Sequence, residues 1–305
     1  MAKKSKKSKA KSKKRSNVVK FPVKKAKSGK KITLRERLDR IYSSKANLAT
    51  TCAGRCECCK VACPQMNYSE FISLLTTIWS KASNDEKLDL ICQSLEYFFL
   101  YDFDKFGKGS LVKPCMLLSE KGECKYYEQR PLNCRLYGLW PEEDYKKRVD
   151  AFAEAYEGKL TREELPLNTQ CPDVKRVDDS VELTTELIQS MFDELDKLDS
   201  QILQFSDAQV KQRENYRTFH DWLLVKVLGE DWLSKLTVFM LAAEPEIIRE
   251  QIKTCKQVFR EQLRGSKLSA VGQGIEAEIK NIEADFEEEE GDAGTSEETG
   301  EGPEG

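Results

Sequence analysis

The chain has very little histidine and no long apolar run. Its 305 residues contain one histidine, His220, which excludes His-rich catalytic zinc sites such as HExxH. The sequence also lacks a P-loop, a GxGxxG segment and a nucleophile elbow, so it gives no indication of nucleotide binding or Ser-His-Asp catalysis. No apolar stretch is long enough to cross a bilayer, and the charged N-terminus is not followed by the apolar segment of a secretory signal. We therefore expect a cytoplasmic protein that is not transmembrane and whose thiols are kept reduced.

Regular alternation of apolar and polar residues is also nearly absent, so the sequence offers few candidate strands. Apolar residues recur at helical spacing instead. The pattern predicts a mainly α-helical fold, in which helices form a scaffold around a loop-built cysteine and metal centre. The expected helices follow Thr33, cover residues 68–81, start again at Asn84, run from Pro141 to about 157, and continue from 180 to about 263 with interruptions near Ser206, Gly229 and Pro245.

Charge is distributed unevenly along the chain, although the formal net charge is only −2. Residues 1–31 contain fifteen Lys or Arg and no acid, whereas residues 276–305 contain thirteen acids and one base. Because blocks of like charge repel themselves, we expect a disordered basic tail over residues 1–31 and a disordered acidic tail over residues 271–305. Between them we expect a cysteine-cluster metal-binding domain at 32–178 and a helical C-terminal segment at 179–270.

The basic tail is a candidate binding element. A lysine-rich arm can neutralise several phosphates and contact nucleic acid or a ribosome without sequence preference. The same charge suits an anionic membrane surface or the acidic tail of this chain, or it can serve only to keep the protein in solution. Charge alone leaves these alternatives open, and it leaves the protein partner or substrate unknown.

Cysteine, unlike histidine, is abundant in the chain, with eleven residues. The stretch TCAGRCECCKVAC, residues 51–63, places five cysteines in thirteen positions, two of them adjacent. Such a cluster allows disulfides, a metal or iron–sulfur site, or redox and nucleophilic chemistry at one sulfur. A reducing compartment disfavours disulfides, whereas thiolates in loops can converge on zinc or on an iron–sulfur cluster. The spacing therefore favours metal binding without naming the metal.

The other six cysteines divide into two groups. Cys92 and Cys255 recur with apolar neighbours on helix faces, so we expect them to pack in the core as small hydrophobes. The remaining four lie in loops that contain Gly and Pro: Cys115, Cys124, Cys134 and Cys171. The single histidine lies in the helical pattern FHDWLLVKVL, and we interpret it as a core or surface residue rather than a ligand.

One alternative within the cluster is a radical S-adenosylmethionine site. Cys52, Cys56 and Cys59 have C-x3-C-x2-C spacing, with which three cysteines leave one iron open for the cofactor. That fold requires repeated strand–helix units after the motif, and here helices follow without a series of apolar strands. We therefore interpret the spacing as a coincidence within a dense cluster.

The second cysteine region, KPCMLLSEKGECKYYEQRPLNCRLYG at residues 113–138, resembles the YkgJ-type cysteine-cluster family, the zinc- or iron-chelating CxxCxxCC proteins. The elements that carry the resemblance are Pro114-Cys115 with Leu117-Leu118, Gly122 and Cys124, Tyr127-Glu128, Arg130-Pro131, Cys134-Arg135 and Tyr137. The first cluster departs from the family's C-x2-C-x2-C-C, because its cysteines are spaced C-x3-C-x-C-C. The resemblance covers roughly residues 50–175, less than half of the chain.

The resemblance implies a bound metal, either an iron–sulfur cluster of the 4Fe-4S type or zinc. Carried over by position, the implied ligands are Cys52, Cys56, Cys58, Cys59, Cys115, Cys124, Cys134 and Cys171. Eight sulfurs exceed what one tetrahedral zinc or one four-iron cluster binds, so either two sites exist or some thiols support the ligands or are redox-active. Cys63 is left over as a ninth thiol. Arg130 and Arg135 are either cationic companions of the cluster or ordinary surface or salt-bridged residues.

Three functions are compatible with the sequence. The first is a metal-binding protein that carries an iron–sulfur cluster or zinc as a redox or metal-bearing module. The second is an enzyme that modifies protein lysines, because a related branch, the flagellin lysine N-methylases, shares this type of cluster. The third is a structural metal site in a nucleic-acid or ribosome accessory protein. The pattern assigns no catalytic residue.

Overall fold

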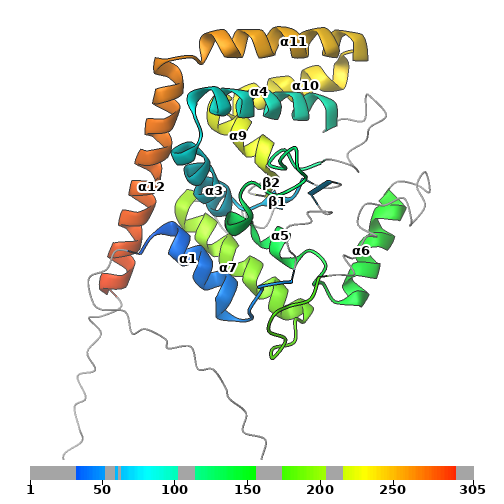
Figure 1. The fold of residues 1–305 in the computed structure, drawn as a ribbon, viewed down its shortest axis with the longest axis vertical. Coiled ribbons are helices and arrows are strands. Elements are labelled where there is room, and N and C mark those ends of the chain that lie inside the picture. The colour runs from blue at the N-terminus through cyan, green and yellow to red at the C-terminus, as the bar shows by residue number, and fades with distance from the viewer. Residues whose placement is uncertain are drawn as a thin grey trace, which may run out of the picture. The chain divides into compact units, whose positions relative to one another are not determined.

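The fold is mainly α-helical, as the sequence predicts (Figure 1). The computed structural model describes residues 32–51, 59–60, 63–101, 114–155, 174–203 and 216–292. The chain divides into two units, Met1–Lys31 and Ile32–Gly305, and every described residue belongs to the second. The elements in order are α1 (Leu34–Ser44), β1 (Gln65–Met66), α3 (Tyr68–Lys81), α4 (Asn84–Tyr101), η1 (Tyr127–Gln129), α5 (Leu132–Leu136), α6 (Glu142–Ala155), α7 (Thr185–Leu203), β2 (Arg217–Thr218), α9 (Phe219–Leu228), α10 (Glu230–Ala242), α11 (Pro245–Gln262) and α12 (Ser266–Asp292). Within this described part of the chain, none of the helices is long and apolar enough to cross a membrane.

Local sequence explains where several of these helices begin and end. At the start of α1 the Thr33 hydroxyl accepts a hydrogen bond from the Glu36 amide, and the Glu36 carboxylate accepts one from the Thr33 amide. Pro245 occupies the first turn of α11, where an N–H would have no partner in the helix. Gly229 separates α9 from α10 with a φ of 87°. These three boundaries confirm predictions from the sequence.

One hydrophobic core joins helices that are far apart in the sequence. Side chains of α1, α3, α7, α9 and α12 form it, and Phe71, Leu195 and Leu223 are fully buried within it. A second apolar cluster lies between α4, α9, α10 and α11, so α9 contributes to both, and Figure 1 shows α9 between the two groups of helices. The first core runs across residue 179, where the sequence pattern starts a separate helical segment.

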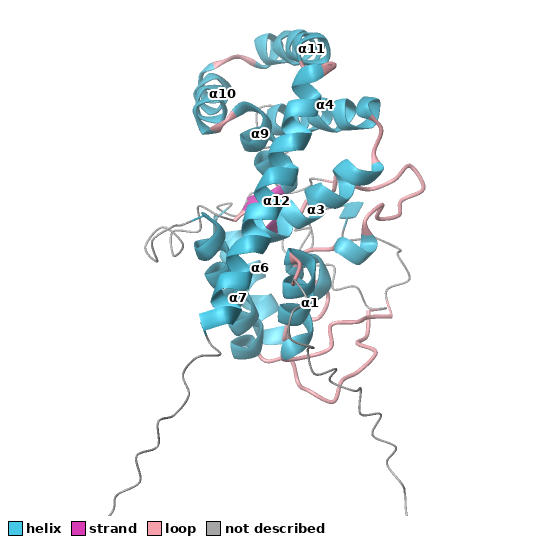
Figure 2. Cartoon of the chain, turned by 90° about the vertical axis from the view of Figure 1, so that its left-hand side faces the viewer, coloured by secondary structure: helices cyan, strands magenta, loops and turns pink. Residues whose placement is uncertain are grey.

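The C-terminal region is helical where its charge predicts disorder. The charge pattern predicts disorder from residue 271, but α12 continues as one helix to Asp292 and passes α3 and α1 (Figure 2). Four of its apolar side chains are buried against the core: Leu268, Ile275, Ile282 and Phe286. They lie seven, seven and four residues apart, so they share one face of the helix. Residues 293–305 and 1–31, the rest of the two predicted tails, lie outside the described residues.

The described strands form one short antiparallel pair. In it Gln65 lies opposite Thr218 and Met66 lies opposite Arg217. The indole Nε1 of Trp222 in α9 donates a hydrogen bond to the Met66 carbonyl over 3.1 Å. The strand pair and this bond hold the chain that follows Cys63 against the start of α9.

Candidate metal centre

The short strand pair brings Cys63 to His220. In the ladder Gln65 faces Thr218, and the same register extended by two residues puts Cys63 opposite His220. The side chains meet there, because Cys63 Sγ lies 3.8 Å from His220 Nδ1. His220 is fully buried, with 0% of its surface exposed. Of the two locations that the sequence leaves open, core and surface, His220 occupies the core, but its imidazole faces a thiol rather than only apolar neighbours.

The other ring nitrogen of His220 lies against the residues that begin α9. Nε2 is 3.2 Å from Thr218 Oγ1 and 3.7 Å from Asp221 Oδ1. The Thr218 hydroxyl accepts a bond from the Asp221 amide over 3.3 Å and donates one to the Asp221 carboxylate over 2.5 Å. The Tyr97 ring of α4 lies 5.7 Å from the imidazole, centroid to centroid. A sulfur, a hydroxyl and an aromatic ring thus fix the orientation of the imidazole.

Two further thiols lie beside Cys63. The Cys115 amide donates a hydrogen bond to the Cys59 carbonyl over 2.6 Å, which joins the first cysteine region to the second. Both residues are buried, with exposed fractions of 8% for Cys59 and 9% for Cys115. The Cys115 thiol makes hydrogen bonds with the side chains of both Cys59 and Cys63. Cys115 is therefore the middle member of a row of three thiols.

These contacts set the protonation of the middle thiol. The hydrogen bond with Cys59 lowers the pKa of Cys115, but the hydrogen bond with Cys63, burial and the charge of Cys63 raise it, and the pKa ends well above its usual value. The Cys115 thiol therefore favours its protonated form. A bound cation would reverse this preference, because thiols ligate metals as thiolates.

The structure describes two more of the implied ligands, Cys124 and Cys134. Cys124 forms an isolated antiparallel bridge with Leu118, which closes a short turn. Cys134 lies on α5, which packs against β1, and the neighbouring Asn133 donates from Nδ2 to the Gln65 carbonyl over 2.8 Å. The α5 helix therefore carries Cys134 to the same strand pair.

The other four implied ligands lie outside the described residues: Cys52, Cys56, Cys58 and Cys171. The described flanks of their segments are paired with one another. Thr50 and Arg176 form an antiparallel bridge, and the Thr51 amide donates to the Lys175 carbonyl over 2.8 Å. This pairing joins the chain that enters the first cysteine region to the chain that follows residue 171.

The donor chemistry fits a metal, although the donors stand in a row. Within the described ranges, no three Cys, His, Asp or Glu side chains already surround one point as ligands of a metal ion. Three thiols and an imidazole in contact are nevertheless the ligand types of Cys3His zinc sites, and thiolates also bind iron–sulfur clusters. Among the seven cysteines that the structure describes, no two are joined to each other by a disulfide.

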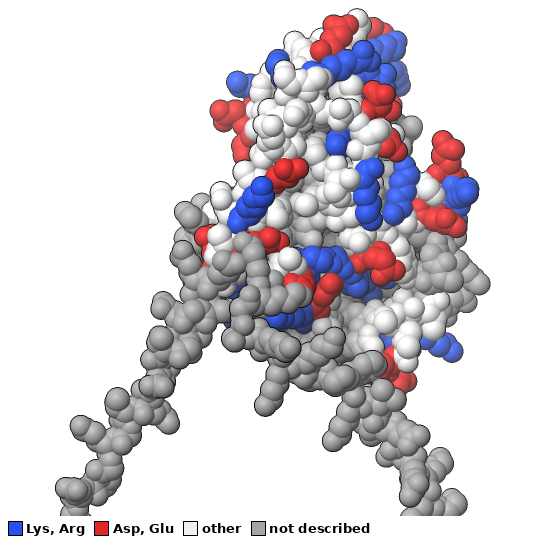
Figure 3. Space-filling view, turned by 60° about the vertical axis from the view of Figure 1, so that its left-hand side comes forward, with Lys and Arg blue, Asp and Glu red and all other residues white. Residues whose placement is uncertain are grey.

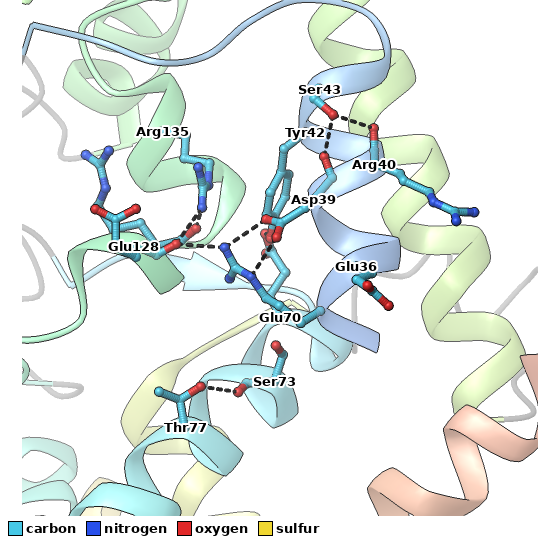
Figure 4. A network of polar contacts seen from close by, with 12 residues as sticks. Glu36, Asp39, Arg40, Tyr42, Ser43, Glu70, Ser73, Thr77, Glu128 and Arg135 are labelled. Carbon is cyan, nitrogen blue, oxygen red and sulfur yellow. Dashed lines mark hydrogen bonds and ion pairs between the residues drawn. The ribbon is translucent and has the colours of Figure 1, made fainter. Parts of the chain in front are cut away.

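The arginines near the second cysteine region hold its backbone. Arg135 donates to the carbonyls of Glu128 and Arg130 over 2.9 and 2.8 Å, and its guanidinium lies 4.5 Å from the centre of the Tyr42 ring (Figure 4). Arg130 donates to the Tyr127 carbonyl over 3.0 Å and lies 3.5 Å above the Tyr127 ring. These contacts fix the loop that precedes α5, and both interpretations of the two arginines from the sequence stay open.

A buried carboxylate near this loop was not identified from the sequence. Glu70 accepts hydrogen bonds from the Tyr42 hydroxyl over 2.7 Å, the Leu132 amide over 2.6 Å and the Asn67 amide over 3.2 Å. Burial raises the pKa of Glu70, while these bonds oppose the rise. Tyr42 and Glu70 point toward each other in Figure 4. Glu70 thereby ties α1, α3 and α5 together, and its sequence signal was the Asn67-x-x-Glu70 capping box.

Comparison with known proteins identifies no relative. No family model, no curated protein and no solved structure matches the chain. The resemblance to the YkgJ-type family stays a prediction, and the function is inferred from the residues described above.

Proposed function

We propose that the chain is a metal-binding protein, which carries an iron–sulfur cluster or zinc on its clustered cysteines and acts as a redox or metal-bearing module. The observation that carries this proposal is the contact of the Cys115 thiol with the thiols of both Cys59 and Cys63. Two loops that are far apart in the sequence meet there through their sulfurs. Apolar side chains would fill the same space without the risk of oxidation, so three converging thiols favour a shared metal.

The backbone around these thiols supports the same proposal. The Cys115 amide is bonded to the Cys59 carbonyl, and α5, which carries Cys134, packs on β1. Residues 49–51 pair with residues 175–177 through backbone hydrogen bonds. Each pairing draws together segments that contain the cysteines of the predicted centre, and such pre-arrangement lowers the entropy that metal binding must overcome.

The described residues that would hold the metal are Cys59, Cys115, Cys124 and Cys134, which the resemblance implies, and Cys63, which it leaves over. A bound cluster supplies electron transfer, whereas zinc supplies a rigid cross-link between the two loops. The chain itself would release the thiol protons on binding, and it buries Cys59 and Cys115, which limits the access of water to their sulfurs.

Metal content under anaerobic conditions tests the proposal. The full-length chain is purified without oxygen, and its visible spectrum is measured together with iron, sulfide and zinc. Iron and sulfide in equal amounts, with absorbance that dithionite bleaches, would establish a cluster. Colourless protein with zinc in stoichiometric amount would establish the zinc form. A chain that retains neither metal, and takes up neither on reconstitution, contradicts the proposal.

Two buried cysteines provide a matched pair of variants. Cys115 and Cys92 have exposed fractions of 9% and 1%, but the Cys92 sulfur contacts the Lys256 carbonyl on α11 rather than the other thiols. We expect Cys115→Ser to lose most of the bound metal and Cys92→Ser to retain it. Equal metal content in the two variants would argue against ligation by Cys115.

The two alternative functions stay predictions. Lysine methylation rests on the family resemblance, and a mass gain of methyl units on a co-expressed substrate would support it. A nucleic-acid or ribosome role rests on residues 1–31 and is tested separately below.

A further inference from the structure

The hydrogen bonds of His220 determine which ring nitrogen carries its proton. The Thr218 hydroxyl has one hydrogen, which it donates to the Asp221 carboxylate, and one of its lone pairs accepts from the Asp221 amide. The remaining lone pair accepts from Nε2–H of His220 over 3.2 Å. A neutral imidazole that is protonated on Nε2 presents an acceptor lone pair on Nδ1. Nδ1 is the nitrogen that faces the Cys63 sulfur.

Metal-bound histidines are held in this way. Such a residue donates its other ring N–H to a nearby oxygen, which fixes both the tautomer and the orientation of the ring. Here the oxygen belongs to Thr218, and the Asp221 carboxylate accepts from Thr218 in turn. The distance of 3.8 Å between Cys63 Sγ and His220 Nδ1 is close to the ~3.6 Å expected between two ligands of a tetrahedral zinc ion, given bonds of about 2.3 Å to sulfur and 2.1 Å to nitrogen.

The imidazole ends the row of three thiols. Cys59 contacts Cys115, Cys115 contacts Cys63, and Cys63 contacts Nδ1 of His220. We propose that Nδ1 of His220 and the sulfurs of Cys59, Cys63 and Cys115 form one Cys3His donor set for a zinc-sized metal ion. This inference rests on the metal-binding function proposed above. Since the described side chains stand in a row, binding turns the cysteine side chains about χ1 until the four donors surround the ion.

This donor set differs from the one that the family resemblance implies. It includes Cys63, which that set leaves over, and His220, which the sequence pattern assigns to the core. Three thiolates and a neutral imidazole around Zn²⁺ have a net charge of about −1, compared with about −2 for four thiolates. The smaller charge suits this location, because His220 has no exposed surface and Cys59 and Cys115 are also buried.

Zinc affinity of His220 variants tests the inference. The full-length chain is freed of metal, and zinc is titrated in competition with a chromophoric chelator. We expect His220→Gln to bind zinc at least ~100-fold more weakly than the wild type, since even the loss of a supporting hydrogen bond costs 10–100-fold. We expect His220→Cys to recover affinity to within ~10-fold, because four cysteines also form a zinc site. A histidine with only a packing role would not be rescued by a thiol.

The supporting hydroxyl gives a second, graded measurement. Thr218→Val removes the acceptor for Nε2–H, and we expect zinc affinity to fall about 10–100-fold. Thr218→Ser keeps the hydroxyl, and we expect its affinity to equal that of the wild type. Zinc affinity that is the same for Thr218→Val and Thr218→Ser would contradict the role of the Thr218 hydroxyl.

Failure of the two proposals can be distinguished. A wild-type chain that binds neither zinc nor iron contradicts both. A wild-type chain whose metal is lost in Cys115→Ser but kept in Cys63→Ser and His220→Gln contradicts only the Cys3His donor set. If metal-free His220→Gln fails to fold, the zinc affinity of His220→Cys relative to the wild type tests the donor set. Tight zinc binding by His220→Cys requires the side chain at position 220 to face the ion, and weak binding by a folded His220→Cys contradicts the donor set.

Discussion

Asp199 is a buried carboxylate at the N-terminus of a helix to which it does not belong. It lies on α7 and accepts hydrogen bonds from the amides of Tyr68 and Ser69, the first residues of α3, over 2.7 and 2.8 Å. It thereby satisfies two amides that have no partner within the helix. Burial raises the pKa of Asp199 to about 7, although its hydrogen bonds with Ser69 and Tyr68 oppose the rise. Asp199 is therefore a buried group that titrates near neutral pH.

We predict that Asp199 makes the folded state less stable as the pH rises from about 4 to about 7. The pKa of Asp199 is about 7 in the folded state and 3.8 for an ordinary Asp, so the folded state binds more protons in this window. The stabilisation is fully present below about pH 4 and is lost as the pH rises through 7, with an upper limit of about 4 kcal/mol. Asp199→Asn removes this dependence. Urea unfolding at pH 5 and pH 8 measures it.

Measuring Asp199→Asn at two pH values separates the effect of the Asp199 charge from the effect of the changed hydrogen bonds. Asn has one side-chain oxygen, so Asp199→Asn leaves an α3 amide poorly paired and costs about 1–3 kcal/mol at pH 5. At pH 8 the wild type has an ionised buried carboxylate, and we expect the difference to shrink or reverse. Glu70, whose pKa is also raised, leaves a residual slope in both proteins. Asp193→Asn, at an exposed position on α7, is the control, and an equal loss for Asp199→Asn at both pH values would contradict the titration.

At the scale of the elements, the connection between α9 and α10 depends on one glycine. Gly229 has φ 87° and ψ 159°, a region that residues with a side chain rarely adopt. A Cβ added there meets no atom within 4 Å, so the cost of a substitution comes from the backbone rather than from a clash. We predict that Gly229→Ala lowers the free energy of unfolding by about 1–3 kcal/mol, as measured by urea denaturation.

Gly274 provides the matched control for this prediction. It lies within α12, is exposed, and also has open space around an added Cβ. Because alanine favours helix, we expect Gly274→Ala to raise the free energy of unfolding by about 0.5–1 kcal/mol. If Gly229→Ala lowers the free energy of unfolding and Gly274→Ala raises it, the second result also supports a helical backbone at residue 274. If Gly274→Ala has no effect or is destabilising, the helical assignment there is wrong.

Most helices were predictable because their signals are local. The capping pair of Thr33 and Glu36 and the apolar spacing within residues 68–81 both lie within a few turns of chain. The prediction of disorder from residue 271 is wrong for residues 271–292, because Ile275 and Ile282 are isolated among acids and their burial depends on α3 and α1. The sequence pattern indicates disorder because acidic residues dominate locally. The few apolar residues of α12 pack on partners that lie about 200 residues earlier in the sequence, so their burial has no local signal.

The candidate site was predictable in part for the same reason. Clustered cysteines in two loops indicate a metal from residue type and spacing alone, and the structure brings Cys59 and Cys115 together. The contact between Cys63 and His220 joins positions 157 apart in the sequence. It depends on two strands of two residues each, which are too short to show alternation. A single histidine on an apolar helix carries no local sign of that contact.

For the whole molecule, charge is segregated along the chain, but the face of the described residues in Figure 3 carries both signs. Residues 1–31 contribute fifteen positive charges, so the formal charge of the chain changes from −2 to −17 when they are removed. On the face shown in Figure 3, Lys and Arg are interspersed with Asp and Glu. We therefore expect any affinity for polyanions to reside in residues 1–31.

We predict that the full-length chain binds double-stranded DNA without sequence preference and that the chain lacking residues 1–31 does not. Binding is measured by fluorescence anisotropy of a labelled duplex. If six or more phosphates are neutralised, affinity falls by ~10³ or more between about 50 and 200 mM salt, because counterions are released on binding. A chain in which the lysines of residues 1–31 are changed to glutamine controls for length, and we expect it to behave like the deletion.

Deletion of residues 293–305 separates this prediction from binding of the basic tail by the chain's own acidic residues. That segment has four acids and no base, so its removal strengthens DNA binding if it competes for residues 1–31. Unchanged affinity would mean that the basic tail is already accessible to DNA. If DNA binding persists after removal of residues 1–31, the DNA-binding surface lies in the remaining chain. That chain has a formal charge of −17, which repels a polyanion. Such binding would require a concentrated basic site rather than a charged tail.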